Sequence, residues 1–332
     1  LIGFGIIIPL LPFYAETFGA SALAIGLLST SFSLMQFLFA PVWGRLSDRY
    51  GRRPMILIGL FGSGVSYVAF GLASSLAMLF AARILSGIAG ANVPTAQAFI
   101  ADSTPPEERA KGMGLIGAAF GLGFIFGPAI GGFLSGWGYT VPAFFAALLC
   151  FVNFAAACVL LPESLPRERR GAVRRQGRLD VFRDAFGRPG LALVLAIFFL
   201  VMTAFASFEA MFALFAAARF GFDATTIGYV FALVGLVLAV VQGVLVGKVV
   251  PRVGERRLVP AAILLMSGAL ALQALAPGVP WLIAGAMLLA CGMGFHSPSM
   301  LSIVSRLASR TDQGSTLGLS QSLAALARIV GP

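Results

Sequence analysis

Two charged side chains stand inside long apolar runs of this sequence, where a charge is costly. Glu209 lies in the run 191–218 and Arg83 in the run 76–100. A charge at the centre of a bilayer costs at least ~2.5 kcal/mol on insertion scales, so Arg83 is expected to face a cavity or a carboxylate. An intramembrane carboxylate usually marks an ion or proton pathway. The alternatives are a Glu209 that only hydrogen-bonds between helices and an Arg83 that snorkels to the interface.

A second cluster combines small, acidic and basic residues at fixed spacing directly after an apolar run. It comprises Gly44, Asp48, Gly51, Arg52 and Arg53. The glycines permit close approach and a tight turn. The aspartate can sit at a helix N-terminus, where the helix dipole favours an anion, and the arginines can pair with nearby carboxylates. The alternative is a charged turn that only fixes the topology.

Glycines recur in one apolar run at spacings that place many of them on one side of a helix. The run contains Gly117, Gly121, Gly123, Gly127, Pro128, Gly131 and Gly132. Glycines four residues apart let a neighbouring helix approach closely, and the proline kinks its own helix. Plain helix packing explains the glycines but not the placement of the Gly-Pro pair.

Uncharged polar residues inside the apolar runs are candidates for lining a cavity. They are Gln36, Asn92, Gln97, Gln242 and His296. The alternative for each is a hydrogen bond between helices. His296 is the sole histidine, so no histidine metal cluster is expected. We find no nucleotide-binding loop, zinc signature or nucleophile triad, so neither an enzyme nor a cofactor is expected.

The elements that must position these residues follow from the composition. Of 332 residues, 59% are hydrophobic and 11% charged, and the mean hydropathy is +0.95. So few charges exclude a soluble domain and predict an all-α polytopic membrane protein. We expect eleven helices, the first and last cut short, at 1–16, 22–43, 55–73, 76–100, 112–135, 140–161, 191–218, 225–248, 259–276, 281–304 and 314–332. The chain is expected to be a fragment of a twelve-helix protein.

The basic residues indicate the orientation in the membrane. Of the 23 lysines and arginines, 20 fall in the intervals 44–54, 102–111, 162–190, 248–257 and 305–312. These alternate loops are therefore predicted to be cytoplasmic. Basic residues spread over short loops at a membrane face favour anionic lipid as the neighbour and argue against nucleic acid.

The two halves of the chain resemble each other at an offset of 202 to 204 residues. The segment Gly44–Arg53 matches Gly247–Arg256, Pro94 matches Pro298, and Gly127-Pro128 matches Gly331-Pro332. Equivalent loops fall on the same side, so the repeat is parallel and predicts two six-helix bundles. The predicted domains are 1–161 for helices 1 to 6, a cytoplasmic linker 162–190, and 191–332 for helix 7 to part of helix 11.

The cytoplasmic cluster, Gly44 to Pro54, resembles the loop signature of the major facilitator superfamily, and Ala82–Gly90 resembles that family's fourth-helix motif. The resemblance implies the major facilitator fold. It also implies a latch that holds the two bundles together while the outside is open, with Asp102 as the partner of Arg52. The second copy carries Pro251 where Asp48 stands, so only the first copy is expected to latch.

The glycine run resembles the fifth-helix signature of the drug-antiporter branch, and Gly5, Pro9 and Pro12 resemble the first helix of tetracycline exporters. The acid that such exporters carry early in the first helix would fall before Leu1. Where tetracycline exporters carry acids in the third and ninth helices, this chain has apolar or hydroxyl residues such as Ser66, which counts against tetracycline itself.

These features favour a secondary active exporter of small apolar or amphiphilic compounds, driven by inward proton flow. We expect Glu209 to take a proton when the site faces out, with Arg83 or substrate competing for its charge. The alternatives are an uptake or metabolite carrier of the same fold for sugars or organic anions, and a non-transporting receptor or scaffold. A monomer in a plasma membrane, such as the bacterial inner membrane, is expected. Arg328, a third charge inside an apolar run, receives no role from the sequence.

Overall fold

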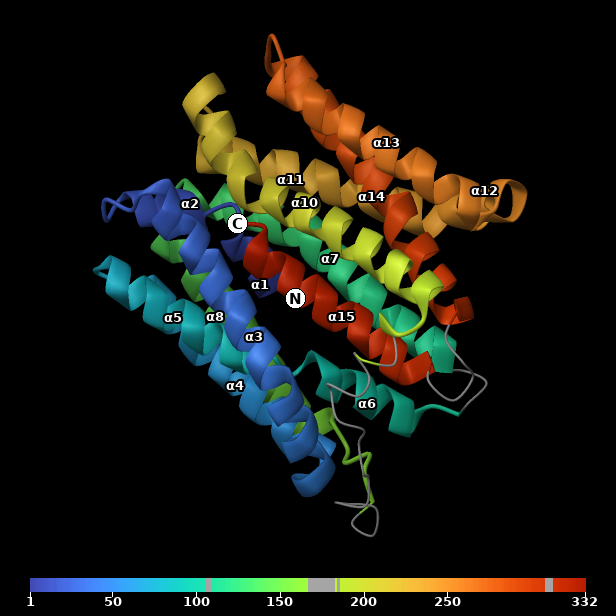
Figure 1. The fold of residues 1–332 in the computed structure, drawn as a ribbon. Coiled ribbons are helices and arrows are strands. Elements are labelled where there is room, and N and C mark those ends of the chain that lie inside the picture. Colours follow the sequence, from blue (N-terminus) through green and yellow to red (C-terminus); the bar gives the residue numbers. More distant parts are fainter. Residues whose placement is uncertain (106–108, 167–182, 184–185, 308–312) are drawn as a thin grey trace. The chain divides into compact units, whose positions relative to one another are not determined.

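The computed structural model describes residues 1–105, 109–166, 183, 186–307 and 313–332 (Figure 1). These residues form helices joined by short turns, and no strand occurs among them. The chain divides into two compact units, residues 1–175 together with Pro332, and residues 176–331. The division falls inside the predicted linker 162–190, most of which lies outside the described residues.

Eight helices occur in the part of the first unit that the structure describes. They are α1 Ile2–Ile7, α2 Leu11–Glu16, α3 Ala22–Tyr50, α4 Arg52–Gly71, α5 Leu76–Gly90, α6 Val93–Ser103, α7 Arg109–Ser135 and α8 Thr140–Leu160. The main packing pairs are α4 with α8, α1 with α7, and α5 with both α3 and α4. Each of these pairs buries apolar faces that a lone helix would expose.

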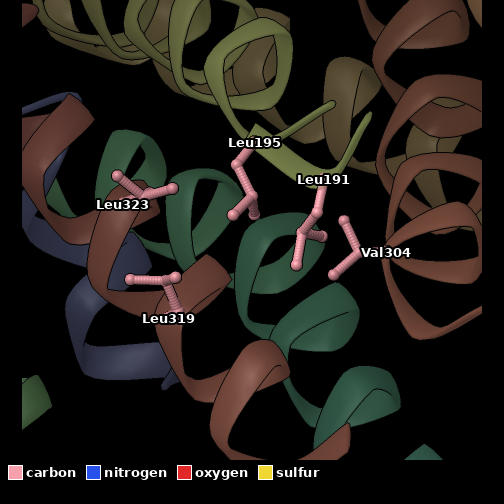
Figure 2. Close-up of a cluster of buried hydrophobic side chains, with 5 residues drawn as sticks. All are labelled: Leu191, Leu195, Val304, Leu319 and Leu323. Carbon is pink, nitrogen blue, oxygen red and sulfur yellow. The ribbon is translucent and has the colours of Figure 1, made fainter. Parts of the chain in front are cut away.

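The second unit, in its described part, consists of α-helices and one short π-helical segment. They are α10 Pro189–Phe220, α11 Ala224–Val240, a π-helical segment Val241–Leu245, α12 Val246–Val253, α13 Glu255–Ala274, α14 Val279–Leu307 and α15 Gln313–Val330. Helices α13 and α14 run side by side along most of their length (Figure 1). Figure 2 shows the cluster that joins α10, α14 and α15 and consists of Leu191, Leu195, Val304, Leu319 and Leu323.

Eight helical stretches are long and apolar enough to cross a membrane within the described parts of the chain. They are Ala22–Tyr50, Arg52–Gly71, Leu76–Ser103, Thr140–Leu160, Gly190–Phe220, Ala224–Val253, Glu255–Ala274 and Val279–Val304. Two shorter apolar helices, Ala119–Ser135 and Leu319–Val330, lie in the fifth and eleventh predicted helices. The all-α membrane fold is thereby confirmed.

Three predicted helices are interrupted. The first, predicted as 1–16, breaks between Ile7 and Leu11 around Pro9. The fourth, predicted as 76–100, breaks at Ala91 and Asn92 just before Pro94. A proline has no N–H and its ring clashes with the preceding turn, which explains both breaks. The eighth, predicted as 225–248, passes through the π-helical segment.

Two predicted loops were wrong in extent. The interval 44–54 is almost all helix, because α3 runs on to Tyr50 and α4 starts at Arg52. Only Gly51, with φ at +111°, separates them. The interval 248–257 repeats this arrangement, with Gly254 at φ +79° between α12 and α13. A positive φ suits glycine alone, so each sharp turn takes one residue rather than the longer loop that the charges suggested.

Candidate functional site

The junction of α3 and α4 concentrates charge around Arg52. The side chain of Arg52 is only 7% exposed, and its Nη1 lies 2.5 Å from Oδ1 of Asp48. Its Nε donates to Oδ2 of Asp102 at 3.0 Å, and Nη1 also donates to the Ser47 hydroxyl at 2.7 Å. The structure thus brings together Asp48, Arg52 and Asp102 from α3, α4 and α6. A buried guanidinium held by two carboxylates is strongly positioned.

The same junction is tied to the end of α8. The backbone N–H of Arg52 donates to Oε1 of Glu163 at 2.8 Å, and Arg53 Nη2 donates to the carbonyl of Cys158 at 2.6 Å. Sequence reasoning missed Glu163 as a partner, although an acid directly after a transmembrane helix was visible. Asp48 lies in the last turn of α3 and pairs with Arg52. That position is a helix C-terminus. A contact of Asp48 with the N-terminus of another helix stays a prediction.

The second unit has a corresponding junction. Glu255 opens α13, and its Oε1 accepts from Nη2 of Arg306 at 2.8 Å and from the Ser302 hydroxyl at 3.0 Å. Glu255 stands 203 residues after Arg52, and Arg306 stands 204 residues after Asp102. The repeat therefore places an ion pair at equivalent positions with the two charges exchanged. Sequence reasoning did not find this pair, because matching identical residues hides an exchange of charge.

Arg83 is buried in the first unit rather than reaching water. It lies on α5 and is 6% exposed, so it does not snorkel to the interface. The Cζ of its guanidinium lies 4.4 Å from the centroid of the Phe32 ring. Tyr67 of α4 interacts electrostatically with Arg83 and is hydrogen-bonded to Ser86 of α5. An aromatic face is a recognised partner for a desolvated arginine.

The break between α5 and α6 explains two of the polar residues. Pro94 lacks an N–H, so the carbonyl of Gly90, four residues earlier, has lost its helical partner. Gln36 Nε2 donates to that carbonyl at 3.4 Å. Asn92 packs against Gly59, where an added Cβ would collide with the amide. Gln36 therefore makes the interhelical hydrogen bond that was its alternative role, and it stabilises the break.

Glu209 of α10 has a charged neighbour in its own unit. It interacts electrostatically with Arg328 of α15. The chain at the end of α15 contacts α10 close to these residues, since the Ser207 hydroxyl donates to the carbonyl of Gly331 at 2.8 Å. Arg328 is the charged partner that sequence reasoning missed. The available signal was that one acid and one arginine lie inside apolar runs of the same half.

The remaining cavity candidates have different surroundings. His296 of α14 is fully buried and stacks on Phe198, with 6.3 Å between ring centroids. Neither of its ring nitrogens has a hydrogen-bond partner among the described residues. Gln242 lies in the π-helical segment and is exposed, and Gln97 of α6 is partly buried. That these residues line a cavity stays a prediction.

The glycine run builds the contact between α1 and α7. A Cβ on Gly127 would lie 2.6 Å from the Cα of Gly5, and one on Gly123 would lie 3.0 Å from the Leu1 carbonyl carbon. A Cβ on Gly131 would collide with the carbonyl of Ile6. Gly121, by contrast, faces open space. Three glycines of the run thus allow two helices to pack backbone to backbone.

No group of three or more metal-ligating side chains occurs in the described part of the chain. The set of candidate features in the two units consists of charged side chains and close helix contacts. It comprises the Arg52 network, the Glu255–Arg306 pair, Arg83 on its aromatic ring, and Glu209 beside Arg328. Protons and ionic groups are the species that such side chains can bind.

The whole length of the chain is similar to known proteins. Residues 1–332 match the family model described as Major Facilitator Superfamily. The chain is 34% identical over 335 residues to the tetracycline resistance protein, class C, of Escherichia coli, covering 100% of this chain and 84% of that protein. It is 30% identical over 337 residues to multidrug resistance protein 2 of Bacillus subtilis, covering 100% of this chain and 84% of the relative.

Two solved transporter structures have a similar fold. The crystal structure of the human organic anion transporter MFSD10 (TETRAN) has a TM-score of 0.74 and 30% identity, covering 100% of this chain and 88% of that one. A bacterial homologue of the human lysosomal transporter Spinster, inward-facing and occupied, has a TM-score of 0.78 and covers 99% of this chain and 76% of that one. At 16% identity, this second likeness supports the fold alone.

Proposed function

The chain belongs to the major facilitator superfamily, and on this basis we propose that it is a proton-coupled exporter of small apolar or amphiphilic compounds. Proteins of this family are transporters and not enzymes, and the protein is a multi-pass membrane protein. The observation that carries the proposal is an intramembrane carboxylate, Glu209, in a chain similar throughout to tetracycline and multidrug resistance proteins. The close α1–α7 packing through glycines supports it, since the run resembles a drug-antiporter signature.

In this proposal Glu209 carries the proton. It is protonated when the site faces out and releases the proton when the site faces in. A carboxylate within an apolar helix is suited to this, because its neutral form is the cheaper one to bury. Arg83 of the first unit is the second charged residue of the proposed pathway. Its pairing with Glu209 stays a proposal, since the two residues belong to different units.

The Arg52 network is proposed to act as the conformational latch. Asp48, Arg52 and Asp102 fix the cytoplasmic ends of α3, α4 and α6 as one rigid block. A rigid block lets the first bundle move as a body during alternating access. We propose that this block, with Gly44, Gly51 and Arg53, holds the two bundles together while the outside is open.

The proposed setting is a bacterial inner membrane, with the linker 162–190 in the cytoplasm. We propose a monomer that contacts membrane lipid, small-molecule substrate and protons. Labelling of a Gly171→Cys variant from the external face of intact cells contradicts this orientation, and labelling only after permeabilisation supports it.

The test uses everted vesicles, a panel of dyes and drugs, and simultaneous measurement of proton flux. Glu209→Gln should abolish uphill, proton-driven efflux while substrate binding and downhill exchange remain measurable. Glu16→Gln is the matched control, since Glu16 is an exposed acid at the end of α2. If the Glu209→Gln variant still drives uphill efflux with the same proton requirement, Glu209 is not the coupling site.

A second candidate is a proton-coupled carrier of organic anions with the same fold. The specific observation in its favour is the arginine beside the proton-carrying acid, Arg328 next to Glu209. The 30% identical relative that is described as an organic anion transporter also supports it. Sugars are not favoured, because sugar sites need many hydrogen-bonding side chains and the apolar runs here carry few.

A further inference from the structure

Glu209 lies in the interior of the apolar helix α10, Arg328 lies in the last turn of α15, and these two charges are opposite. Glu209 is the sole acid in α10, and Arg328 is the sole charged residue of α15. Each is partly buried. Because a lone charge in a bilayer is costly, an acid and an arginine on packed helices lower each other's cost.

Contacts between the two helices fix this neighbourhood. The Ser207 hydroxyl donates to the Gly331 carbonyl at 2.8 Å. Gly331 lies so close to α10 that a Cβ there would be 2.9 Å from the Thr203 carbonyl oxygen. Arg328 lies three residues, or ~4.5 Å, before Gly331, and Glu209 lies two residues, or ~3 Å, after Ser207. Long side chains span such a separation, and the electrostatic interaction of Glu209 with Arg328 is the result.

The other titratable groups on the helices packed against α10 are few. Helix α14 carries His296, Cys291 and, in its last turn, the exposed Arg306 that pairs with Glu255, and α11 carries Tyr229. Tyr229 is exposed, and Cys291 is partly buried. His296 stacks on a ring eleven residues along α10 from Glu209, which is ~16 Å. Arg328 is therefore the charge that responds directly to protonation of Glu209.

We propose that Glu209 and Arg328 form a proton-gated site for the anionic group of an amphiphilic substrate. With Glu209 ionised, its carboxylate neutralises the guanidinium. When a proton binds the carboxylate, Glu209 becomes neutral and releases the Arg328 positive charge, which then binds a carboxylate, sulfonate or phosphate group. One proton is gained for each anion bound, so the sum of the charges at the site stays at zero for a monoanion.

The sign of this linkage follows from reciprocity. If protonation favours anion binding, anion binding must favour protonation by the same factor. Proton and anion therefore occupy this site together, whereas a cation would compete with the proton for Glu209. The inference rests on the proposed proton role of Glu209. It deepens the second candidate function, a carrier in which proton and anion move in the same direction, and it does not describe the export proposed first. It assigns the substrate class of that carrier to a residue, Arg328.

The experiment measures binding to the purified protein in lipid nanodiscs with three probes that share one ring system. Naphthalene-1-sulfonate is an anion whose charge does not change with pH, naphthalene-1-methanol is neutral, and naphthylmethyl-trimethylammonium is a permanent cation. We expect the sulfonate to bind with uptake of about one proton in weakly buffered solution. Its affinity should fall up to tenfold for each pH unit above the titration of Glu209, as one linked proton requires.

The variants separate the two roles. Arg328→Gln should weaken sulfonate binding by about tenfold or more, and Arg328→Lys should retain part of it. Glu209→Gln, neutral at every pH, should bind the sulfonate without proton uptake and with a flat pH profile. Arg257→Gln is the matched control, since Arg257 is an exposed arginine of the same unit, and it should change the affinity less than twofold.

Two outcomes overturn the inference. One is wild-type sulfonate affinity and pH dependence in Arg328→Gln, and the other is proton release on sulfonate binding. If Arg328→Gln does not accumulate, an unchanged pH slope in Glu209→Gln overturns it equally. Binding is measured without transport. A protein that shows the linkage but no proton-driven flux refutes the proposed function alone, and one that shows flux without linkage refutes the anion site alone.

Discussion

The two units build the junctions α3–α4 and α12–α13 at equivalent positions with opposite charges. In the first unit Arg52 opens α4 and pairs with Asp102 near the end of α6. In the second unit Glu255 opens α13 and pairs with Arg306 near the end of α14. A glycine with positive φ precedes the opening residue in both. Backbone and position are thus repeated, while the sign of each charge is not.

The two pairs differ in burial. The residues that open α4 and α13 are both little exposed, Arg52 at 7% and Glu255 at 12%, but their partners differ, since the Asp102 side chain is 30% exposed and that of Arg306 is 71% exposed. Arg52 is also held by Asp48 and Ser47, and Pro251 occupies the position equivalent to Asp48 in the second copy. Breaking a buried pair leaves an uncompensated charge, while a pair with one partner mostly in water is screened. The same junction can therefore be a rigid network in one bundle and a weak tie in the other.

The largest effect is expected from Asp48→Asn. The change keeps the size of the side chain but removes one of the carboxylates that hold the buried Arg52 guanidinium. Transport should fall severely, by tenfold or more, while the protein still inserts. The measurement is proton-driven efflux in everted vesicles, compared at equal membrane abundance. Pro251→Ala at the equivalent position is the control and should transport nearly normally. Near-normal transport by Asp48→Asn would reduce the first junction to a topology signal.

Charge reversal of Arg52 should come next. Arg52→Glu should destabilise the first unit by roughly 3–5 kcal/mol, because it leaves carboxylates buried without a cation. Adding Asp102→Arg restores one opposite pair but leaves Asp48 facing a like charge, so only part of the loss should return. Thermal unfolding of the detergent-solubilised protein measures this. Full recovery in the double variant would show that Asp48 does not contribute to holding Arg52.

The corresponding reversal in the second unit should have a smaller effect. Glu255→Arg alone should lower the unfolding temperature less than Arg52→Glu does, since its partner Arg306 is mostly in water. The double variant Glu255→Arg with Arg306→Glu should recover the wild-type value, because no third carboxylate contacts this pair among the residues described. Equal losses at the two junctions would remove the distinction between a rigid network and a weak tie.

The sequence was sufficient for the overall fold and for the first junction. The lengths of the apolar runs predicted membrane helices, and the resemblance of Gly44 to Pro54 to a family loop signature implied the pairing of Arg52 with Asp102, which the structure places together. The exchanged pair, Glu255 with Arg306, was not predictable by matching identical residues. To find this pair, one must combine the repeat offset of 203 to 204 residues with the positions at which α13 begins and α14 ends.

Local breaks and side-chain partners were also beyond the sequence. Pro94 interrupts its helix, whereas α14 continues through the equivalent Pro298. A proline alone therefore does not decide between a break and a kink, because the neighbouring side chains must satisfy the freed carbonyl, as Gln36 does for Gly90. Arg328 was visible as a charge, but its proximity to Glu209 depends on how α15 packs on α10.

The smallest predicted effect compares the N-terminal ends of α3 and α11, where the repeat again preserves a position and changes its charge. Ser21 caps α3 by accepting from the N–H of Ala24 at 3.3 Å. Asp223, 202 residues later, caps α11 by accepting from the N–H of Thr226 at 2.8 Å. A hydrogen bond from the Thr226 hydroxyl, and then one from its N–H, lower the pKa of Asp223 below its ordinary value of 3.8. A carboxylate cap therefore titrates, and a hydroxyl cap does not.

The sign of the pH effect follows from the lowered pKa of Asp223. Its capping contribution is fully present above pH ~4 and is lost as the pH falls through the pKa in the folded state. Asp223→Ala should cost about 0.5–1 kcal/mol near neutral pH, the lower part of the range for N-caps, because the site is exposed. Ser21→Ala should cost a similar or smaller amount at every pH. Unfolding of both variants and the wild type, measured between pH 3 and 7, tests this. The difference in the free energy of unfolding between Asp223→Ala and the wild type should shrink toward pH 3. The corresponding difference for Ser21→Ala should stay constant. A constant difference for both variants would show that the charge of Asp223 adds nothing to its cap.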